Sequence, residues 1–97
     1  MMKKRKSTSN VFRDLGFNPE EAANLKVRAR LMIEVEKYIR ARHLTQKEAA
    51  ARLGVTQPRI SDLMRGKIGL FSVDTLITML THAGLMVDVR VRRSAAA

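Results

Sequence analysis

The stretch LTQKEAAARLGVTQPRISDLMRG, residues 44–66, contains two short helix patterns separated by one glycine. Thr45 is a favourable N-cap residue, and Glu48 three positions later completes a capping box at the start of the first pattern. Gly54 ends this helix, because glycine readily adopts the left-handed conformation needed just after a helix C-terminus. The sequence therefore predicts a helix over residues 45–53 and a turn at Gly54.

A second helix is expected over residues 56–65. Thr56 is its N-cap, Pro58 fits its first turn, and Gly66 ends it. The turn between the two helices is too short to let them lie antiparallel, so they must cross steeply. The apolar residues expected to pack between the helices are Ala49, Ala50, Leu53, Ile60 and Leu63.

The polar side of the second helix carries side chains that can read DNA. The residues left outside are Gln57, Pro58, Arg59, Ser61, Asp62 and Arg65. Glutamine pairs with adenine and arginine with guanine through two hydrogen bonds in the major groove. The pattern predicts a helix-turn-helix at 45–65 whose second helix enters that groove. From the chemistry alone, Arg59 is the strongest candidate for base reading.

The flanking sequence predicts two further helices. Asn18 and Pro19 are a helix start, and the periodic apolar residues that follow extend this helix to about Arg42, with a possible break at 26–30. Ser72 is the expected cap of the last helix, which Gly84 ends.

The ends of the chain follow other patterns. From residue 85 to 92 the apolar period changes to two, which predicts a short C-terminal β-strand. A single strand has no ladder partner of its own, so it must pair with an N-terminal segment near residues 10–12 or with its copy in a second chain. The apolar segment 10–17 docks on the core or on a partner protein, and the basic residues 1–10 are expected to be a disordered arm.

Composition limits the class of protein. The 97 residues suffice for one domain, here 11–97, and a net charge of +10 favours a polyanionic partner. There is no cysteine and no apolar run of about 20 residues, so we expect a soluble cytoplasmic protein, associated with the nucleoid through DNA. His43 and His82 are isolated in sequence, and no metal site, cofactor or catalytic residue is expected.

At the residues of the two central helices the chain resembles the lambda-repressor-like, or XRE-type, helix-turn-helix family. The matching motifs are L-T-Q at 44–46, A-A at 49–50, L-G-V at 53–55, T-Q-x-x-I-S-x-L at 56–63 and R-G-K at 65–67. The wider frame, NVFRDLGF at 10–17 and FSVDTLITMLTHAGLMVDVRV at 71–91, is similar to the HigA-like antitoxin branch, whose members partner RelE-type toxins.

The resemblance implies an all-α, five-helix DNA-binding domain with 56–65 as the recognition helix. Carried over by position, Gln46 would bond a phosphate and Lys67 would contact the DNA backbone beyond the recognition helix. The positions that match base-facing ones are Gln57, Pro58 and Asp62, and those nearer the sugar-phosphate chain are Thr56 and Arg59. Pro58 and Asp62 stand where some relatives carry longer polar side chains, so the operator read by relatives does not transfer to this chain.

The sequence thus predicts a repressor that forms a homodimer through its strand or its last helix. The homodimer binds a palindromic double-stranded operator. A two-fold dimer would set the recognition helices about 34 Å apart, on successive major grooves. The leading interpretation is an antitoxin that represses its own operon and binds a RelE-type toxin. The alternatives are a stand-alone phage-type or metabolic repressor, and a charge-driven RNA- or membrane-binding protein. The few aromatic residues argue against single-strand recognition.

Overall fold

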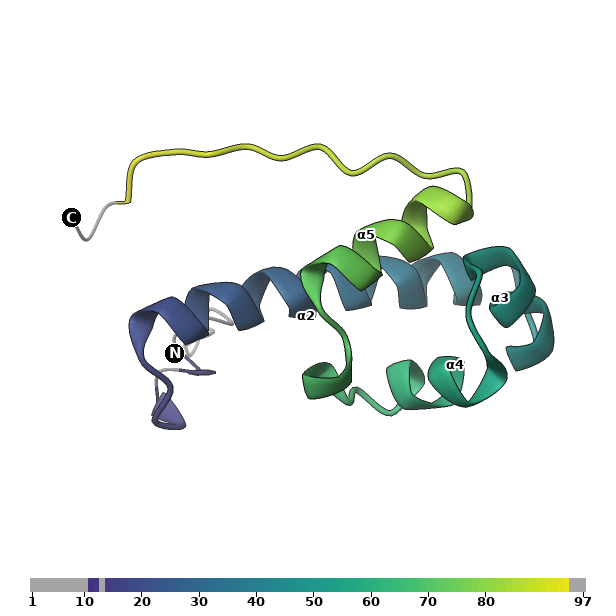
Figure 1. The fold of residues 1–97 in the computed structure, drawn as a ribbon, viewed down its shortest axis with the longest axis horizontal. Helices are drawn as coiled ribbons and strands as arrows, with labels where there is room; N and C mark the ends of the chain where they lie inside the picture. Colours follow the sequence, from purple (N-terminus) through teal and green to yellow (C-terminus); the bar gives the residue numbers. More distant parts are fainter. Residues whose placement is uncertain (1–10, 13, 95–97) are drawn as a thin grey trace, which may run out of the picture.

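The computed structural model describes residues 11–12 and 14–94, so the basic arm predicted at 1–10 and the last residues, 95–97, lie outside it. Four α-helices and one 3-10 turn follow each other along this part of the chain (Figure 1). They are α2 (Pro19–Ala41), α3 (Gln46–Leu53), α4 (Gln57–Met64), η1 (Ile68–Leu70) and α5 (Val73–His82). The all-α class predicted from the sequence is confirmed.

The longest helix, α2, contacts α4, α5 and η1. The Oδ1 atom of Asn18 accepts a hydrogen bond of 2.8 Å from the backbone N–H of Glu21, and Pro19 occupies the first helical position. The helix continues without the break considered at 26–30. Only its second half enters the core fully, because the buried residues after Ala22 start at Leu31.

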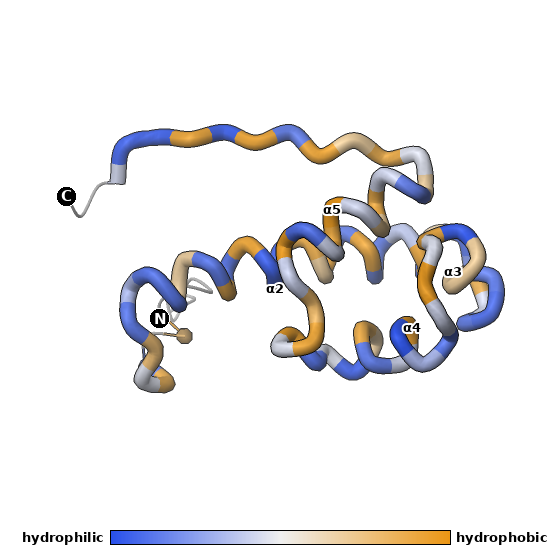
Figure 2. The backbone as a smooth tube through the Cα atoms, viewed as in Figure 1, coloured by the Kyte–Doolittle hydropathy of each residue, from blue (hydrophilic) through white to orange (hydrophobic). Residues whose placement is uncertain are grey.

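Helices α3, α4 and α5 pack around the second half of α2 and enclose the core. α2 lies along α5, while α3 contacts both α4 and α5. Figure 2 shows apolar residues on the inward sides of these helices and polar residues outside. The most deeply buried large side chains are Val35, Leu53, Ile60, Leu63, Phe71, Leu76 and Met79. The predicted contact of Ala49, Ala50 and Leu53 with the α4 residues is part of this core.

The last helix, α5, begins as predicted. The hydroxyl of Ser72 accepts a hydrogen bond of 3.1 Å from the backbone N–H of Thr75. The 3-10 turn η1 joins α4 to this cap and touches α2. Gly84 has a positive φ of 86° just after the helix, so its role as the stop is also confirmed.

The predicted C-terminal strand is not observed among the described residues. Residues 85–94 carry no strand assignment and run back as an extended segment beside α5 and α2 (Figure 1). Val87 packs against the core, whereas Val89 and Val91 are 79% and 89% exposed. The physical reason is that a strand needs a neighbour for its backbone hydrogen bonds, and no described part of this chain lies where it could supply one.

The expected five-helix count is likewise not found in the described residues. Before α2 there is only a short helical turn at residues 11–12 and 14, which folds back beside the start of α2. Just after it, the backbone N–H of Phe17 donates to the carbonyl of Phe12 at 3.1 Å, and the two rings meet edge to face with centroids 6.0 Å apart. Such a turn is too short to add a helix to the core.

Candidate nucleic-acid interface

The turn between α3 and α4 has the geometry that the sequence predicted. Gly54 has φ 69° and ψ 31°, which is the left-handed region, and its N–H bonds to the carbonyl of Ala50. The N–H of Val55 donates to the same carbonyl at 3.0 Å. A left-handed residue reverses the chain within one position, so α4 leaves the end of α3 at a steep angle.

A residue distant in sequence supports this turn. A Cβ atom built on Gly54 would lie 2.9 Å from Cδ2 of His82, at the end of α5. The Nδ1 atom of His82 is 3.3 Å from the carbonyl oxygen of Arg52. Glycine is therefore required at position 54 for two reasons, the positive φ and the close approach of the imidazole ring.

The start of α4 differs from the other helix starts. Thr56 occupies the N-cap position, but its side chain makes no capping hydrogen bond. Asn18, Thr45 and Ser72 each cap their own helix. The expectation that Thr56 caps α4 through its side chain is therefore wrong. Its hydroxyl and the backbone N–H groups of Gln57 and Arg59 remain available to an external acceptor, whereas Pro58 has no N–H, and the helix dipole favours an anion there.

The outer surface of α4 presents the predicted base-facing residues. Gln57 and Pro58 are exposed in the first turn, while Ser61 and Asp62 are half-buried farther along. Glutamine offers an acceptor and a donor in one side chain, and proline offers only an apolar surface. Of these four residues, Gln57 is the best placed to read a base.

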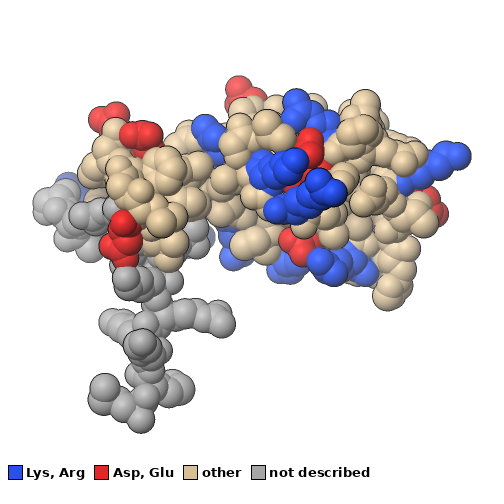
Figure 3. All heavy atoms as spheres, turned by 90° about the horizontal axis from the view of Figure 1, so that it is seen from below, with Lys and Arg blue, Asp and Glu red and all other residues tan. Residues whose placement is uncertain are grey.

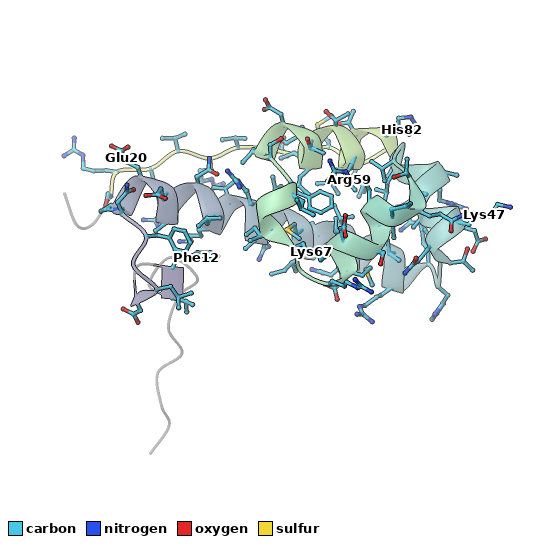
Figure 4. All side chains as sticks on the ribbon, turned by 60° about the horizontal axis from the view of Figure 1, so that its bottom comes forward. Phe12, Glu20, Lys47, Arg59, Lys67 and His82 are labelled. Carbon is cyan, nitrogen blue, oxygen red and sulfur yellow. The ribbon has the colours of Figure 1, made fainter. Side chains whose placement is uncertain are left out.

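Arg59 is held against the next loop. Its Nη1 atom donates to the carbonyl of Leu70 at 3.2 Å, and its guanidinium carbon lies 5.6 Å from the ring centroid of the buried Phe71. Figure 4 shows Arg59 lying between α4 and the start of α5. One of its five N–H groups makes this hydrogen bond, and the residue as a whole is exposed. This geometry favours a contact beside the groove over the freely projecting base reader expected from the chemistry alone.

Asp62 and Lys67 form an ion pair across the end of α4. Nζ of Lys67 lies 3.4 Å from Oδ1 of Asp62, and the two side chains are 48% and 25% exposed. The carboxylate thus partly neutralises a cation that the family pattern assigns to the DNA backbone. Arg65 is exposed at the C-cap position of α4, next to this pair.

Helix α3 presents Gln46 to solvent as its first residue. The capping box before it is complete: the N–H of Thr45 donates to Oε1 of Glu48 at 2.9 Å, and the N–H of Glu48 donates to Oγ1 of Thr45 at 3.1 Å. The hydrogen bond that the Glu48 carboxylate accepts from the backbone N–H of Thr45, followed by one from the Thr45 side chain, lowers the pKa of Glu48 below its ordinary value. The box fixes the backbone of Gln46, which is the expected phosphate contact.

Charge is distributed unevenly over the molecule. Figure 3 shows Lys and Arg side chains gathered over the side of the helix-turn-helix, and acidic side chains at the far end of α2. Five basic residues belong to α3, α4 and the residues just after α4: Lys47, Arg52, Arg59, Arg65 and Lys67. Figure 4 places Lys47, Arg59 and Lys67 well away from Glu20. A polyanion is therefore attracted to the helix-turn-helix side.

Sequence reasoning missed two supports of this interface. No structural role was expected for His82, which is exposed, yet its ring packs on the turn glycine. Leu70 supplies the carbonyl that holds Arg59. Neither contact has a local signal, because His82 lies 28 residues from Gly54 and Leu70 lies 11 residues from Arg59.

Comparison with known proteins agrees with this geometry. A family model described as a helix-turn-helix domain matches residues 11–92. A solved structure assigned to the XRE family of transcriptional regulators is 33% identical, with a TM-score of 0.70 over 77% of this chain and 84% of the other. The chain is an XRE-type helix-turn-helix protein. No curated protein matches the chain.

No group of three His, Asp or Glu side chains in the described part of the chain could hold a metal ion. Over the same residues, no helix is long and apolar enough to cross a membrane.

Proposed function

We propose that this XRE-type protein is a sequence-specific transcriptional repressor and the antitoxin of a type II toxin–antitoxin pair that regulates its own operon. The observation that carries the DNA-binding part is the exposed first turn of α4, with Gln57 beside an uncapped helix N-terminus. An uncapped N-terminus binds a phosphate, and a glutamine next to it then reaches a base edge. Repression follows by occlusion of the promoter, which needs no catalytic group.

The proposed mode of DNA binding assigns a role to each predicted residue. Gln57 and Pro58 face bases, and Ser61 and Asp62 border the same groove. The phosphate contacts come from Gln46, Thr56, Arg59, Arg65 and Lys67. Phosphate contacts fix the register of the protein on DNA, and contacts to base edges give the sequence preference. Loss of a phosphate-contacting residue should therefore weaken binding to all DNA, whereas loss of a base-facing residue should reduce the sequence preference.

The proposed operator is palindromic, because we expect two copies to bind together. Residues 85–92 stay extended and keep their alternation of valines with charged residues, although the described residues form no ladder with them. Antiparallel pairing with the same segment of a second copy would satisfy these backbone groups and cover Val89 and Val91. The predicted strand would then form in the homodimer.

The dimer is tested by sedimentation. Val89→Lys should shift the chain towards the monomer, since it places a charge on the face covered by pairing. Met86→Lys is the matched control, because Met86 is 85% exposed and precedes Val87 by one residue, on the other face of the extended segment. Equal sedimentation of both variants and the unchanged chain would contradict pairing through this segment.

The repressor function is tested by fluorescence anisotropy with the DNA upstream of the gene and with scrambled DNA, at several salt concentrations. The unchanged chain should prefer the upstream DNA, and Gln57→Ala should lose that preference. Asn24→Ala is the control, because it removes an equally exposed amide from α2, away from α4. Equal binding of both DNAs with one steep salt slope would instead indicate a nonspecific polyanion binder.

The toxin partner rests on the resemblance of residues 10–17 and 71–91 to the HigA-like branch, and it has its own test. Co-expression with the product of the adjacent gene should give a stable complex if that product is a RelE-type toxin. Specific promoter binding without such a complex would favour the alternative, a stand-alone phage-type or metabolic repressor.

A further inference from the structure

Two open hollows lie along one face of α2, on either side of Ile68 in η1. The larger, about 530 Å³, lies between the first half of α2 and η1, with Leu25 and Phe17 among its walls. The second continues towards the core and is bordered by Phe12 and Ile33. Both are mainly apolar, so together they form a groove along the part of α2 that the other helices leave uncovered. We call it the α2 groove.

The apolar wall of the α2 groove is held in place by contacts between its own side chains. Phe12 and Phe17 stack edge to face, and this contact holds the Phe17 ring at the mouth while 39% of the residue stays exposed. Leu15 beside them is 70% exposed. Apolar surface gathered at one place on a small chain is typical of a protein-binding site.

The rim of the groove is acidic, in contrast to the rest of this chain with its net charge of +10. Glu20 and Glu21 line the larger hollow. Among the described residues, neither carboxylate has an ion-pair partner, whereas Glu34 and Glu36 farther along α2 are paired. Their position in the first turn suits the helix dipole but leaves both charges open to a cation. A basic ligand is therefore favoured at this end.

The groove also contains a donor that lacks an acceptor. The Nε atom of Arg28, which lines the larger hollow, is buried without a hydrogen-bond partner in the described structure. A buried N–H is normally satisfied, so an oxygen atom of a ligand would complete this site. A backbone carbonyl is the oxygen that any peptide segment supplies.

We propose that the α2 groove binds a basic amphipathic segment of another protein. Its apolar side chains fill the two hollows, its Lys or Arg side chains pair with Glu20 and Glu21, and one of its carbonyls accepts from Nε of Arg28. The acidic end of the groove, at Glu20, lies well away from Lys47, Arg59 and Lys67 (Figure 4), while the second hollow reaches Leu63 and Gly66 at the end of α4. This inference does not depend on the DNA-binding function.

The test uses the full chain and two fluorescent peptides of about 16 residues that share the same leucine pattern, one carrying lysines and the other glutamates at the polar positions. The lysine peptide should bind despite the like net charge of the protein, and the glutamate peptide should bind at least about tenfold more weakly. Glu20→Lys/Glu21→Lys should reduce binding of the lysine peptide by at least about tenfold. Asp74→Lys is the matched control, because Asp74 is an exposed acid in the first turn of α5.

A second pair of variants tests the apolar wall. Leu25→Gln should weaken binding, while Val27→Gln should not, because Val27 is 47% exposed and is not part of the groove. Circular dichroism and promoter binding of each variant report that the fold and the DNA function are intact. Equal binding of the two peptides, or no effect of the glutamate changes, would overturn the proposal. Self-association of the unchanged chain that Glu20→Lys/Glu21→Lys abolishes would also overturn it, because the occupant would then be a second copy.

Discussion

The imidazole of His82 closes over Gly54, so the end of α5 packs directly on the turn of the helix-turn-helix. The two residues are 28 positions apart, and the contact leaves no room for a Cβ atom at position 54. The angle between α3 and α4 is therefore set by the turn itself and also by the helix that packs behind it.

Gly54→Ala should lower the stability of the fold. A left-handed conformation costs a non-glycine residue about 1–2 kcal/mol, and contact with His82 adds to that cost. A loss of this size corresponds to a fall in Tm of about 4–16 °C for so small a domain. Thermal denaturation followed by circular dichroism measures it.

Gly69→Ala is the matched control, because Gly69 has neither a positive φ nor an atom within 4 Å of a built Cβ. It should leave Tm nearly unchanged. Gly54→Ala should lower Tm less in a chain that already carries His82→Ala, because the imidazole ring that would clash with the new Cβ atom is then absent. An equal fall in Tm for both glycine variants would contradict the role of the turn.

Gln57 and Arg59 should differ in their effect on DNA binding. Gln57→Ala should lower the preference for the operator over scrambled DNA by about tenfold, since a bidentate base contact contributes about 1–3 kcal/mol of discrimination. Arg59→Ala should weaken binding to both DNAs alike and reduce the salt slope by about one. Anisotropy titrations at several salt concentrations distinguish the two. A large loss of sequence preference in Arg59→Ala would show that Arg59 leaves Leu70 to read a base.

Asp62→Asn should strengthen nonspecific DNA binding. The change removes a negative charge from the α4 side and frees Lys67, so affinity at low salt should rise by about threefold to tenfold and the salt slope should steepen by up to about one. Glu36→Gln is the control, because it frees Arg40 from a 2.8 Å ion pair on α2. Stability should change little in either variant, as ion pairs at the surface contribute about 0–1 kcal/mol. A similar gain in both variants would mean that net charge alone decides the effect.

The contribution of Glu48 to stability should depend on pH. Its pKa is lower in the folded chain than its ordinary value of 4.5 because of the capping hydrogen bonds, so the ionised form stabilises the fold above that value. This stabilisation should be lost as the pH falls from 4.5 through the lower folded pKa. The difference in Tm between the unchanged chain and Glu48→Gln should shrink over the same range. A difference that stays constant below pH 4.5 would contradict the assignment.

Local signals in the sequence were enough to predict the helices and the turn. The capping box of Thr45 and Glu48, the left-handed Gly54 and the cap at Ser72 each depend on residues within a few positions, and all appear in the structure. The outward face of α4 follows from the same periodicity, which is why Gln57 could be predicted to be exposed.

The errors arise where a residue depends on distant partners. The alternation of apolar and charged residues in 85–92 indicates which face of the segment is apolar. A β-strand also requires a second strand for its backbone hydrogen bonds, and the alternation does not identify that strand. The exposure of Arg59 was predictable, but the carbonyl 11 residues away that holds its side chain was not. Thr56 has the residue type of a cap, yet its hydroxyl points to no amide of its own helix.

The missing side-chain cap of Thr56 affects the stability of α4. Because α4 has eight residues and lacks the side-chain cap that α2, α3 and α5 have, we expect its first turn to fray more readily than theirs. Part of the free energy of operator binding would then go into ordering the first turn, so DNA acts as the missing cap. Amide hydrogen exchange should accordingly be fastest at the start of α4 in the free protein and should slow there most on binding.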